Sequence, residues 1–264
     1  MIKSNLHTHS IYCDGKNSIE EMVLRALSLG FTSLGFSSHA YTGLKEDCSQ
    51  MSLEGTKKYF KEIDEMKEKY KAIINIFKGL EQEAAYPFNA DLDYAIYSCH
   101  FLNTEKGLLS IDFKAEYLKE LLETLGGKDN FFKSYYNTLL DNSDKVDFQI
   151  VGHLDIYTKF DEKYHIIEEV PSIALDAVDE LNRKGKIFEI NTGAIGRGYR
   201  TSFYPSDKIL DHLKAISAKI IVTSDCHNAD YLNCFFAETR EILLNKGFKT
   251  QMELTPNGFQ EVAL

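Results

Sequence analysis

The stretch NLHTHSIYCDG, residues 5–15, carries two histidines two positions apart and an aspartate five residues after the second. His7 and His9 follow directly on a strand-like run at 2–6. Residues two apart on an extended chain point to the same side, so this pair can bind one metal ion together. Asp14 is close enough along the chain to join them. A His-x-His pair alone is common, and its meaning depends on what the rest of the chain offers.

The composition is that of an ordinary globular protein, with 44% hydrophobic and 27% charged residues among 264. Barrels of alternating strands and helices often reach this length as one unit, so we expect one barrel domain over residues 1–264. The net charge of -10 argues against nonspecific binding to nucleic acid or to anionic membranes. Five cysteines without a CxxC pair, no signal segment and no membrane-spanning run predict a cytoplasmic protein. The oligomeric state is left open.

Short strand-like runs alternate with stretches of helical periodicity along the whole chain. We expect strands at 2–6, 31–38, 73–79, 92–98, 147–152, 186–191 and 219–224. We expect helices at 18–29, 53–71, 115–125, 129–142, through 175–181 and near 206–216 and 234–246, and an outer strand after the last helix. Ser18 and Glu21 form a capping box at the start of the first helix. Core positions are favoured over a substrate wall for four aromatic residues: Phe131, Phe132, Tyr135 and Tyr136. Strands separated by helices pair in parallel, because parallel strands need long crossovers, which indicates an α/β fold. An open sheet and a closed barrel both fit this alternation.

Potential metal ligands follow six of the seven expected strands. They are His7, His9, Asp14, His39, Glu81, His100, His153, Asp225 and His227. The carboxyl ends of barrel strands meet on one face, where the connecting loops converge. Closure would bring the first and seventh strands together, and with them the first and last pairs of ligands. An open sheet gives no comparable reason for those pairs to meet. The pattern therefore favours closure of the seven strands into a barrel, with a metal site at the C-terminal ends of the strands.

Imidazole nitrogen combined with carboxylate oxygen suits zinc, iron or manganese. Nine such groups exceed the four that one zinc ion usually takes, which predicts two or three divalent ions sharing a carboxylate bridge. Any one of these histidines alone could be an ordinary core residue whose ring is hydrogen-bonded. Six of the chain's eight histidines follow expected strands, and independent core positions do not explain that arrangement. Glu83, two residues after Glu81, is an alternative ligand.

A glycine-rich stretch after the sixth strand, NTGAIGRGYR at 191–200, carries two of the chain's five arginines. Guanidinium groups grip phosphate oxygens through paired hydrogen bonds. Close to a metal site, Arg197 is the better candidate for anchoring a substrate phosphate. Arg200 fits that role and the role of a solvated loop charge equally well. Lys159, after the fifth strand, is a weaker candidate.

Together these segments resemble the polymerase and histidinol phosphatase (PHP) superfamily, and most of all its histidinol-phosphate phosphatase branch. The matching pieces are HTHSIYCDG, FSSHA, GLEQE, DYAIYSCHFL, VGHLDIYTKF, EINTGAIGRG and TSDCH, between residues 7 and 227. The resemblance implies a distorted (β/α)7 barrel with three ions at the C-terminal ends of its strands. The implied ligand sets are His7, His9, Glu81 and Asp225 for the first ion, Glu81, His100 and His153 for the second, and Asp14, His39 and His227 for the third.

Two positions depart from the superfamily pattern. Some members carry histidine in place of Asp14, and a carboxylate there should favour a harder ion or weaken zinc at the third site. Many relatives have an aspartate directly before the histidine of the second strand end, where this chain has Ser38.

The residues suggest hydrolysis of a phosphate monoester by water that two cations activate. The ions and Arg197 would neutralise charge on the phosphoryl oxygens, and Asp225 or His227 would pass a proton to the leaving alkoxide. The resemblance implies L-histidinol phosphate as the substrate, in histidine biosynthesis. One alternative is another phosphoesterase of the superfamily, acting on a nucleotide or a sugar phosphate. The other is a metal-binding module without activity.

Overall fold

The structure is a computed structural model that describes residues 1–45 and 47–264. Its main sheet has seven strands, all paired in parallel, in the order β1-β2-β3-β4-β7-β8-β9. Their bounds are β1 Ser4–Asn5, β2 Ser33–Phe36, β3 Asn75–Glu83, β4 Tyr94–Ser98, β7 Ile150–Val151, β8 Ile187–Asn191 and β9 Ile220–Thr223. All seven expected strands are present, and the α/β prediction is confirmed.

The sheet curls until its first and last strands meet at their carboxyl ends. The backbone N–H of His9 donates to the carbonyl of Cys226 at 2.8 Å, and that of Cys226 donates to the carbonyl of His7 at 3.1 Å. A parallel bridge between Thr8 and Cys226 continues the seam. Of the two alternatives, the distorted (β/α)7 barrel is therefore confirmed, and the open sheet is not what the structure shows. The seam lies where the two ligand pairs of the sequence were expected to meet.

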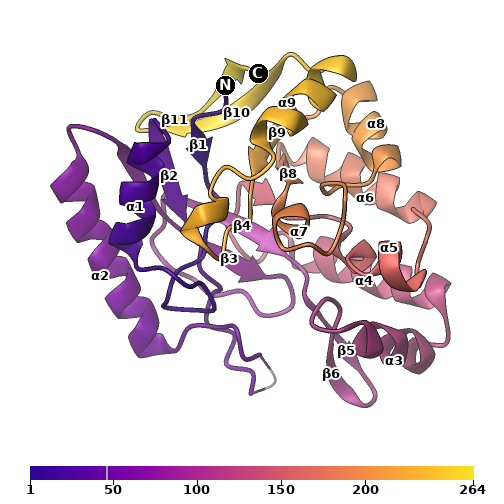
Figure 1. Cartoon of the computed structure of the whole chain (residues 1–264). Helices are drawn as coiled ribbons and strands as arrows, with labels where there is room; N and C mark the ends of the chain where they lie inside the picture. Colours follow the sequence, from indigo (N-terminus) through magenta and orange to yellow (C-terminus); the bar gives the residue numbers. More distant parts are fainter. Residues whose placement is uncertain (46) are drawn as a thin grey trace.

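Helices cover the outside of the barrel (Figure 1). The longer ones are α1 Ile19–Ser28, α2 Leu53–Tyr70, α3 Ala115–Leu125, α4 Lys128–Asn142, α6 Ser172–Arg183, α8 Asp207–Ala215 and α9 Phe236–Asn245. Short turns of helix lie in the loops, namely η1 Ile156–Thr158, α5 Asp161–Tyr164, α7 Gly193–Gly196 and η2 Ala229–Tyr231. Helix α1 starts with the expected capping box, in which Ser18 and Glu21 bond each other's backbone N–H groups. None of the helices in the described residues is long and apolar enough to cross a membrane.

The barrel interior is filled by side chains, and the ring of Tyr94 runs across it. The Tyr94 hydroxyl donates to the carbonyl of Leu6 on the other side. A Cβ at Gly79 would lie 2.5 Å from the ring, and one at Gly35 would lie 2.5 Å from the hydroxyl. Glycines in β2 and β3 thus leave the space that this tyrosine occupies.

Two hairpins supplement the barrel. The first is β10 (Thr250–Thr255) with β11 (Gly258–Ala263), which lies beside the N-terminus in Figure 1 and packs apolar side chains under the barrel interior. The sequence indicated only an outer strand there. The second is β5 (Phe101–Thr104) with β6 (Gly107–Ser110), which precedes α3 and was not predicted. Four aromatic residues of α4 belong to the core, as expected: Phe131, Phe132, Tyr135 and Tyr136.

Candidate metal centre

Glu81 occupies the middle of a ring of histidines at the carboxyl end of the barrel. It lies within β3 rather than after it, because the pairing of β3 with β4 continues to Glu83. Its Oε2 atom is 3.3 Å from His7 Nε2 and 3.5 Å from His9 Nε2. His39 Nδ1, from the loop after β2, lies 3.1 Å from the same oxygen. Three histidines from two segments of the chain thus face one carboxylate oxygen.

The other oxygen of Glu81 faces two further histidines. Oε1 is 3.3 Å from His100 Nε2 and 2.9 Å from His153 Nε2. Glu83 stands behind His100, where its Oε2 accepts from the backbone N–H at 3.0 Å and faces Nδ1 at 3.1 Å. Glu83 therefore contacts the far side of the His100 ring, whereas Glu81 contacts the side that faces the other histidines.

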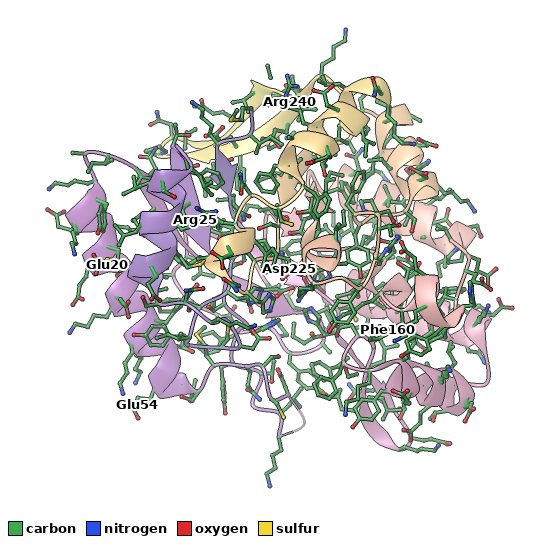
Figure 2. All side chains as sticks on the ribbon, in the orientation of Figure 1. Glu20, Arg25, Glu54, Phe160, Asp225 and Arg240 are labelled. Carbon is green, nitrogen blue, oxygen red and sulfur yellow. The ribbon has the colours of Figure 1, made fainter. Side chains whose placement is uncertain are left out.

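Asp225 joins this group across the barrel seam and lies near the centre of Figure 2. Its Oδ1 is 3.2 Å from His9 Nε2 and 3.6 Å from His7 Nε2, while Oδ2 accepts from Arg197 Nη2 at 2.8 Å. Asp225 has a φ of 46°, in the left-handed region that residues other than glycine rarely adopt. A Cβ at Gly193 would lie 2.7 Å from the Asp225 Cβ, so glycine is needed for this close approach. Such strain is typical of functional sites.

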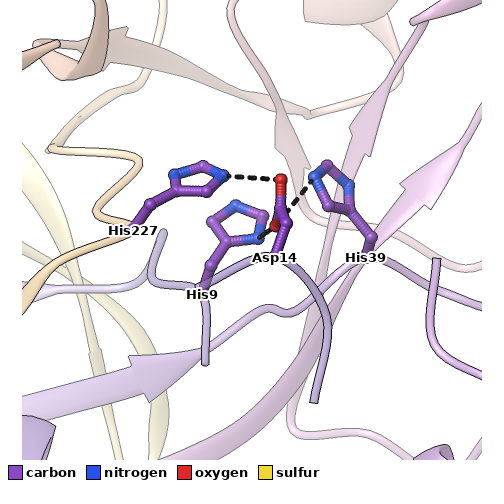
Figure 3. Close-up of side chains that lie close together, drawn as sticks. All are labelled: His9, Asp14, His39 and His227. Carbon is purple, nitrogen blue, oxygen red and sulfur yellow. Dashed lines mark ion pairs between the residues drawn. The ribbon is translucent and has the colours of Figure 1, made fainter. Parts of the chain in front are cut away.

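Asp14 faces three imidazoles at the mouth of the site (Figure 3). Its Oδ1 is 3.6 Å from His9 Nδ1 and 3.7 Å from His39 Nε2, and its Oδ2 is 3.3 Å from His227 Nε2. The Asp14 side chain is 41% exposed, whereas that of Glu81 is 1% exposed. The group around Asp14 is thus the part of the site most open to solvent.

The donor atoms fit divalent metal ions. Four groups have ligand atoms within 4.8 Å of one another: His9, Asp14, His39 and His227; His7, His153 and Asp225; His7, His9 and Glu81; His39, Glu81 and His100. Three buried atoms at their centre have no hydrogen-bond partner in the described part of the chain: His7 Nε2, His9 Nε2 and Glu81 Oε2. Buried polar atoms are rarely left unpaired, and cations between them would satisfy all three. All nine residues that the sequence singled out as ligands are thus together.

The electrostatics keep two of these donors, Glu81 and His9, in the forms that bind metal. Burial raises the pKa of Glu81, but His7, His100 and His39 together bring it well below its usual range. Burial, with help from two neighbouring histidines, lowers the pKa of His9 to about 3. Metal ions bind ionised carboxylates and neutral imidazoles, so Glu81 and His9 have the required charge states at neutral pH.

Glu189, on β8, belongs to the site although the sequence analysis did not single it out. Its side chain is fully buried, and its Oε1 lies 2.5 Å from His7 Nδ1. Burial raises the pKa of Glu189, but His7 and other neighbours lower it below the usual value overall. The sequence feature that could have revealed Glu189 is its place inside the otherwise apolar strand KIFEIN, because a buried carboxylate needs hydrogen-bond or charged partners.

A cavity of about 500 Å³ opens beside the histidines. Arg197 lines it, with Asp225 and His227 on the same wall. Lys159 lines it too, and its Nζ bonds Asp112 Oδ2 at 2.9 Å. Arg200 lies outside the set of described residues that line this cavity, and its guanidinium bonds the hydroxyls of two neighbouring residues, Thr158 and Ser202. The guanidinium closest to the metal-type donors is therefore that of Arg197.

Comparison with known proteins agrees with this geometry. The PHP domain family matches residues 5–193, which is most of the chain. The chain belongs to the PHP domain family. The site extends past the matched region, because Asp225 and His227 come from the loop after β9.

Relatives within this family are named as phosphatases. The histidinol-phosphatase of Bacillus subtilis is 26% identical over 257 residues, covering 87% of this chain and 95% of the relative. A Schizosaccharomyces pombe protein named "Probable histidinol-phosphatase" is 25% identical over 250 residues, covering 86% and 80%. The crystal structure of a histidinol phosphate phosphatase from Lactococcus lactis, complexed with zinc, L-histidinol and phosphate, superposes with a TM-score of 0.74. It is 20% identical and covers 98% of both chains, and this likeness establishes the PHP barrel.

Proposed function

We propose that this chain is a metal-dependent phosphomonoesterase that hydrolyses L-histidinol phosphate to L-histidinol and phosphate. The observation that carries the proposal is the guanidinium of Arg197 beside a cluster of metal-type donors, in one cavity. Metal donors next to a fixed cation suit a dianionic phosphate, because both neutralise its oxygens. The names of the two relatives, and the molecules bound to the Lactococcus lactis enzyme, support histidinol phosphate as the substrate.

Three ions would use every donor of the cluster. We assign His7, His9, Glu81 and Asp225 to the first ion, Glu81, His100 and His153 to the second, and Asp14, His39 and His227 to the third. The contacts of Glu81 with histidines through both of its oxygens support its role as the bridge. His9 also lies near Asp14 and is a second candidate for sharing between ions. Zinc, iron and manganese all suit this mixture of nitrogen and oxygen donors.

The chain's own residues would orient the phosphate and move the proton. When bound, divalent cations supply Lewis acidity and make water a better nucleophile at neutral pH. Arg197 keeps N–H groups for the phosphoryl oxygens while Asp225 holds one of its terminal nitrogens. Asp225 or His227, which both line the cavity, would take a proton from the attacking water and pass it to the leaving alkoxide.

The test compares substrates under one set of conditions. Metal-loaded protein is assayed for phosphate release from L-histidinol phosphate, from a panel of sugar phosphates and from nucleoside monophosphates. The proposal predicts the highest kcat/KM for histidinol phosphate. A higher kcat/KM for any other monoester would replace this substrate assignment while keeping the phosphatase. No release from any monoester by metal-loaded protein would reject the activity itself.

A further inference from the structure

Glu189 is a buried carboxylate that lies next to the proposed metal ligands without being one of them. Its Oε1 accepts from the Thr223 hydroxyl at 2.6 Å and lies 2.5 Å from His7 Nδ1. Its Oε2 accepts from the backbone N–H of His153 at 2.7 Å and from Asn191 Nδ2 at 2.9 Å. Each carboxylate oxygen thus has two partners, which leaves neither oxygen free to bind an ion.

These bonds determine which atom of His7 faces the metal-type donors. A carboxylate can only accept, so the ring nitrogen that faces Glu189 carries the proton. In the neutral ring, the form that binds a metal ion, the other nitrogen, Nε2, then has the free lone pair. That atom lies 3.3 Å from Glu81 Oε2 and 3.6 Å from Asp225 Oδ1, and it has no hydrogen-bond partner in the described residues. The proton on one side of the ring fixes the ligand atom on the other side.

The second oxygen of Glu189 acts on a different proposed ligand. By holding the backbone N–H of His153, it fixes the start of the loop after β7. The His153 ring then reaches Glu81 Oε1 at 2.9 Å. One carboxylate on β8 therefore positions two histidines that approach Glu81 from opposite oxygens.

We infer that Glu189 is a positioning residue of the metal centre, which sets the tautomer of His7 and the location of His153 and so raises the affinity for the ions that these two histidines hold. This inference rests on the proposed metal-dependent function. Carboxylates that bond the outer nitrogen of a metal-binding histidine orient the ring and raise its basicity.

Glu189→Gln keeps the shape of the side chain but replaces one acceptor oxygen with a donor. Whichever way the amide turns, two of the four partners then face an N–H group. Loss of such a partner lowers metal affinity by about 10–100-fold, and we expect a loss of that size for zinc. The matched control is Thr223→Val, which removes one bond to the same oxygen of Glu189 but touches neither histidine.

The experiment titrates zinc into metal-free wild type, E189Q and T223V in a competing chelator, and measures the melting temperature of each metal-free protein. The inference predicts weaker zinc binding by E189Q, near wild-type binding by T223V and similar melting temperatures for the metal-free proteins. Equal affinity in E189Q and wild type would overturn it, and so would an equal loss in T223V. If wild type takes up no zinc, the proposed function fails first and the inference falls with it.

A second measurement needs no variant. Nitrogen-15 NMR of zinc-loaded wild type reports which ring nitrogen of each histidine carries a proton. The inference predicts a proton on His7 Nδ1 and zinc on Nε2. Zinc on Nδ1 would overturn the inference even if E189Q does not fold.

Discussion

Replacing Arg197 with alanine tests how the site holds a phosphate. In the structure its Nε donates to the carbonyl of Gly193, its Nη2 donates to Asp225 and its Nη1 lies 3.5 Å from His227 Nδ1, so about two of its five N–H groups stay free for a ligand. A hydrogen bond to a charged group contributes about 1.5–3 kcal/mol, and a paired contact uses two of them. Lys159 and the ions remain in the variant, so we expect a net loss of about 3 kcal/mol, or about 100-fold in kcat/KM.

The assay measures kcat/KM for L-histidinol phosphate together with the metal content of the same samples, because Arg197 also pairs with Asp225. Arg200→Ala is the matched control, since that guanidinium is turned toward Thr158 and Ser202. We expect R200A to lose less than about tenfold. A value for R197A within about threefold of wild type, at full metal content, would refute phosphate binding by Arg197.

Four further predictions follow from contacts in the site and the barrel. Glu81→Gln should lower metal content and reduce kcat by more than about 1000-fold, because five histidines face the two oxygens of this carboxylate; retention of all ions in E81Q would contradict its bridging role. Asp14→His should raise the affinity of the third site for zinc relative to manganese, because imidazole is the softer donor; an unchanged preference in calorimetry with each metal would contradict this. Burial lowers the pKa of His7, but Glu189, Glu81 and Asp225 raise it well above its usual value, so an ion that binds this ring must displace a proton. Zinc affinity should therefore rise with pH. Calorimetric titrations in buffers of different ionisation enthalpy should show the released proton, and equal heats in all buffers would contradict this. Gly79→Ala should destabilise the fold by about 1–3 kcal/mol, because its Cβ would meet the Tyr94 ring; denaturant unfolding that matches wild type would show that the ring can move aside.

The seven strands and the convergence of the nine candidate ligands were predictable because both follow from short local patterns. Each donor comes at or close after a run of buried residues, and parallel strands bring such ends to one face. Closure of the barrel likewise predicts Asp225 and His227 beside His7 and His9, because it makes the first and last strands neighbours. The Ser18 and Glu21 capping box was also a local signal, and the structure contains it.

Features that depend on partners distant in sequence were not predictable. Glu81 and Glu83 lie inside β3 because that strand continues along β4, and strand length from sequence does not include the neighbour's register. Glu189 acts through His7, 182 residues away, so no local spacing reveals the contact. The two strands of the β5–β6 hairpin are short, and hydrophobic and polar residues alternate only weakly along them. The clearest signal in the sequence is Gly107, which has a φ of 102° in the turn.

Elemental analysis of the protein, purified without added metal and then saturated and dialysed, measures most directly whether the barrel's donors hold cations. The nine converging side chains predict about three divalent ions per chain, falling by at least one in E81Q. A wild-type protein that holds less than about one ion per chain after saturation would contradict a metal centre around Glu81, and with it the proposed hydrolysis.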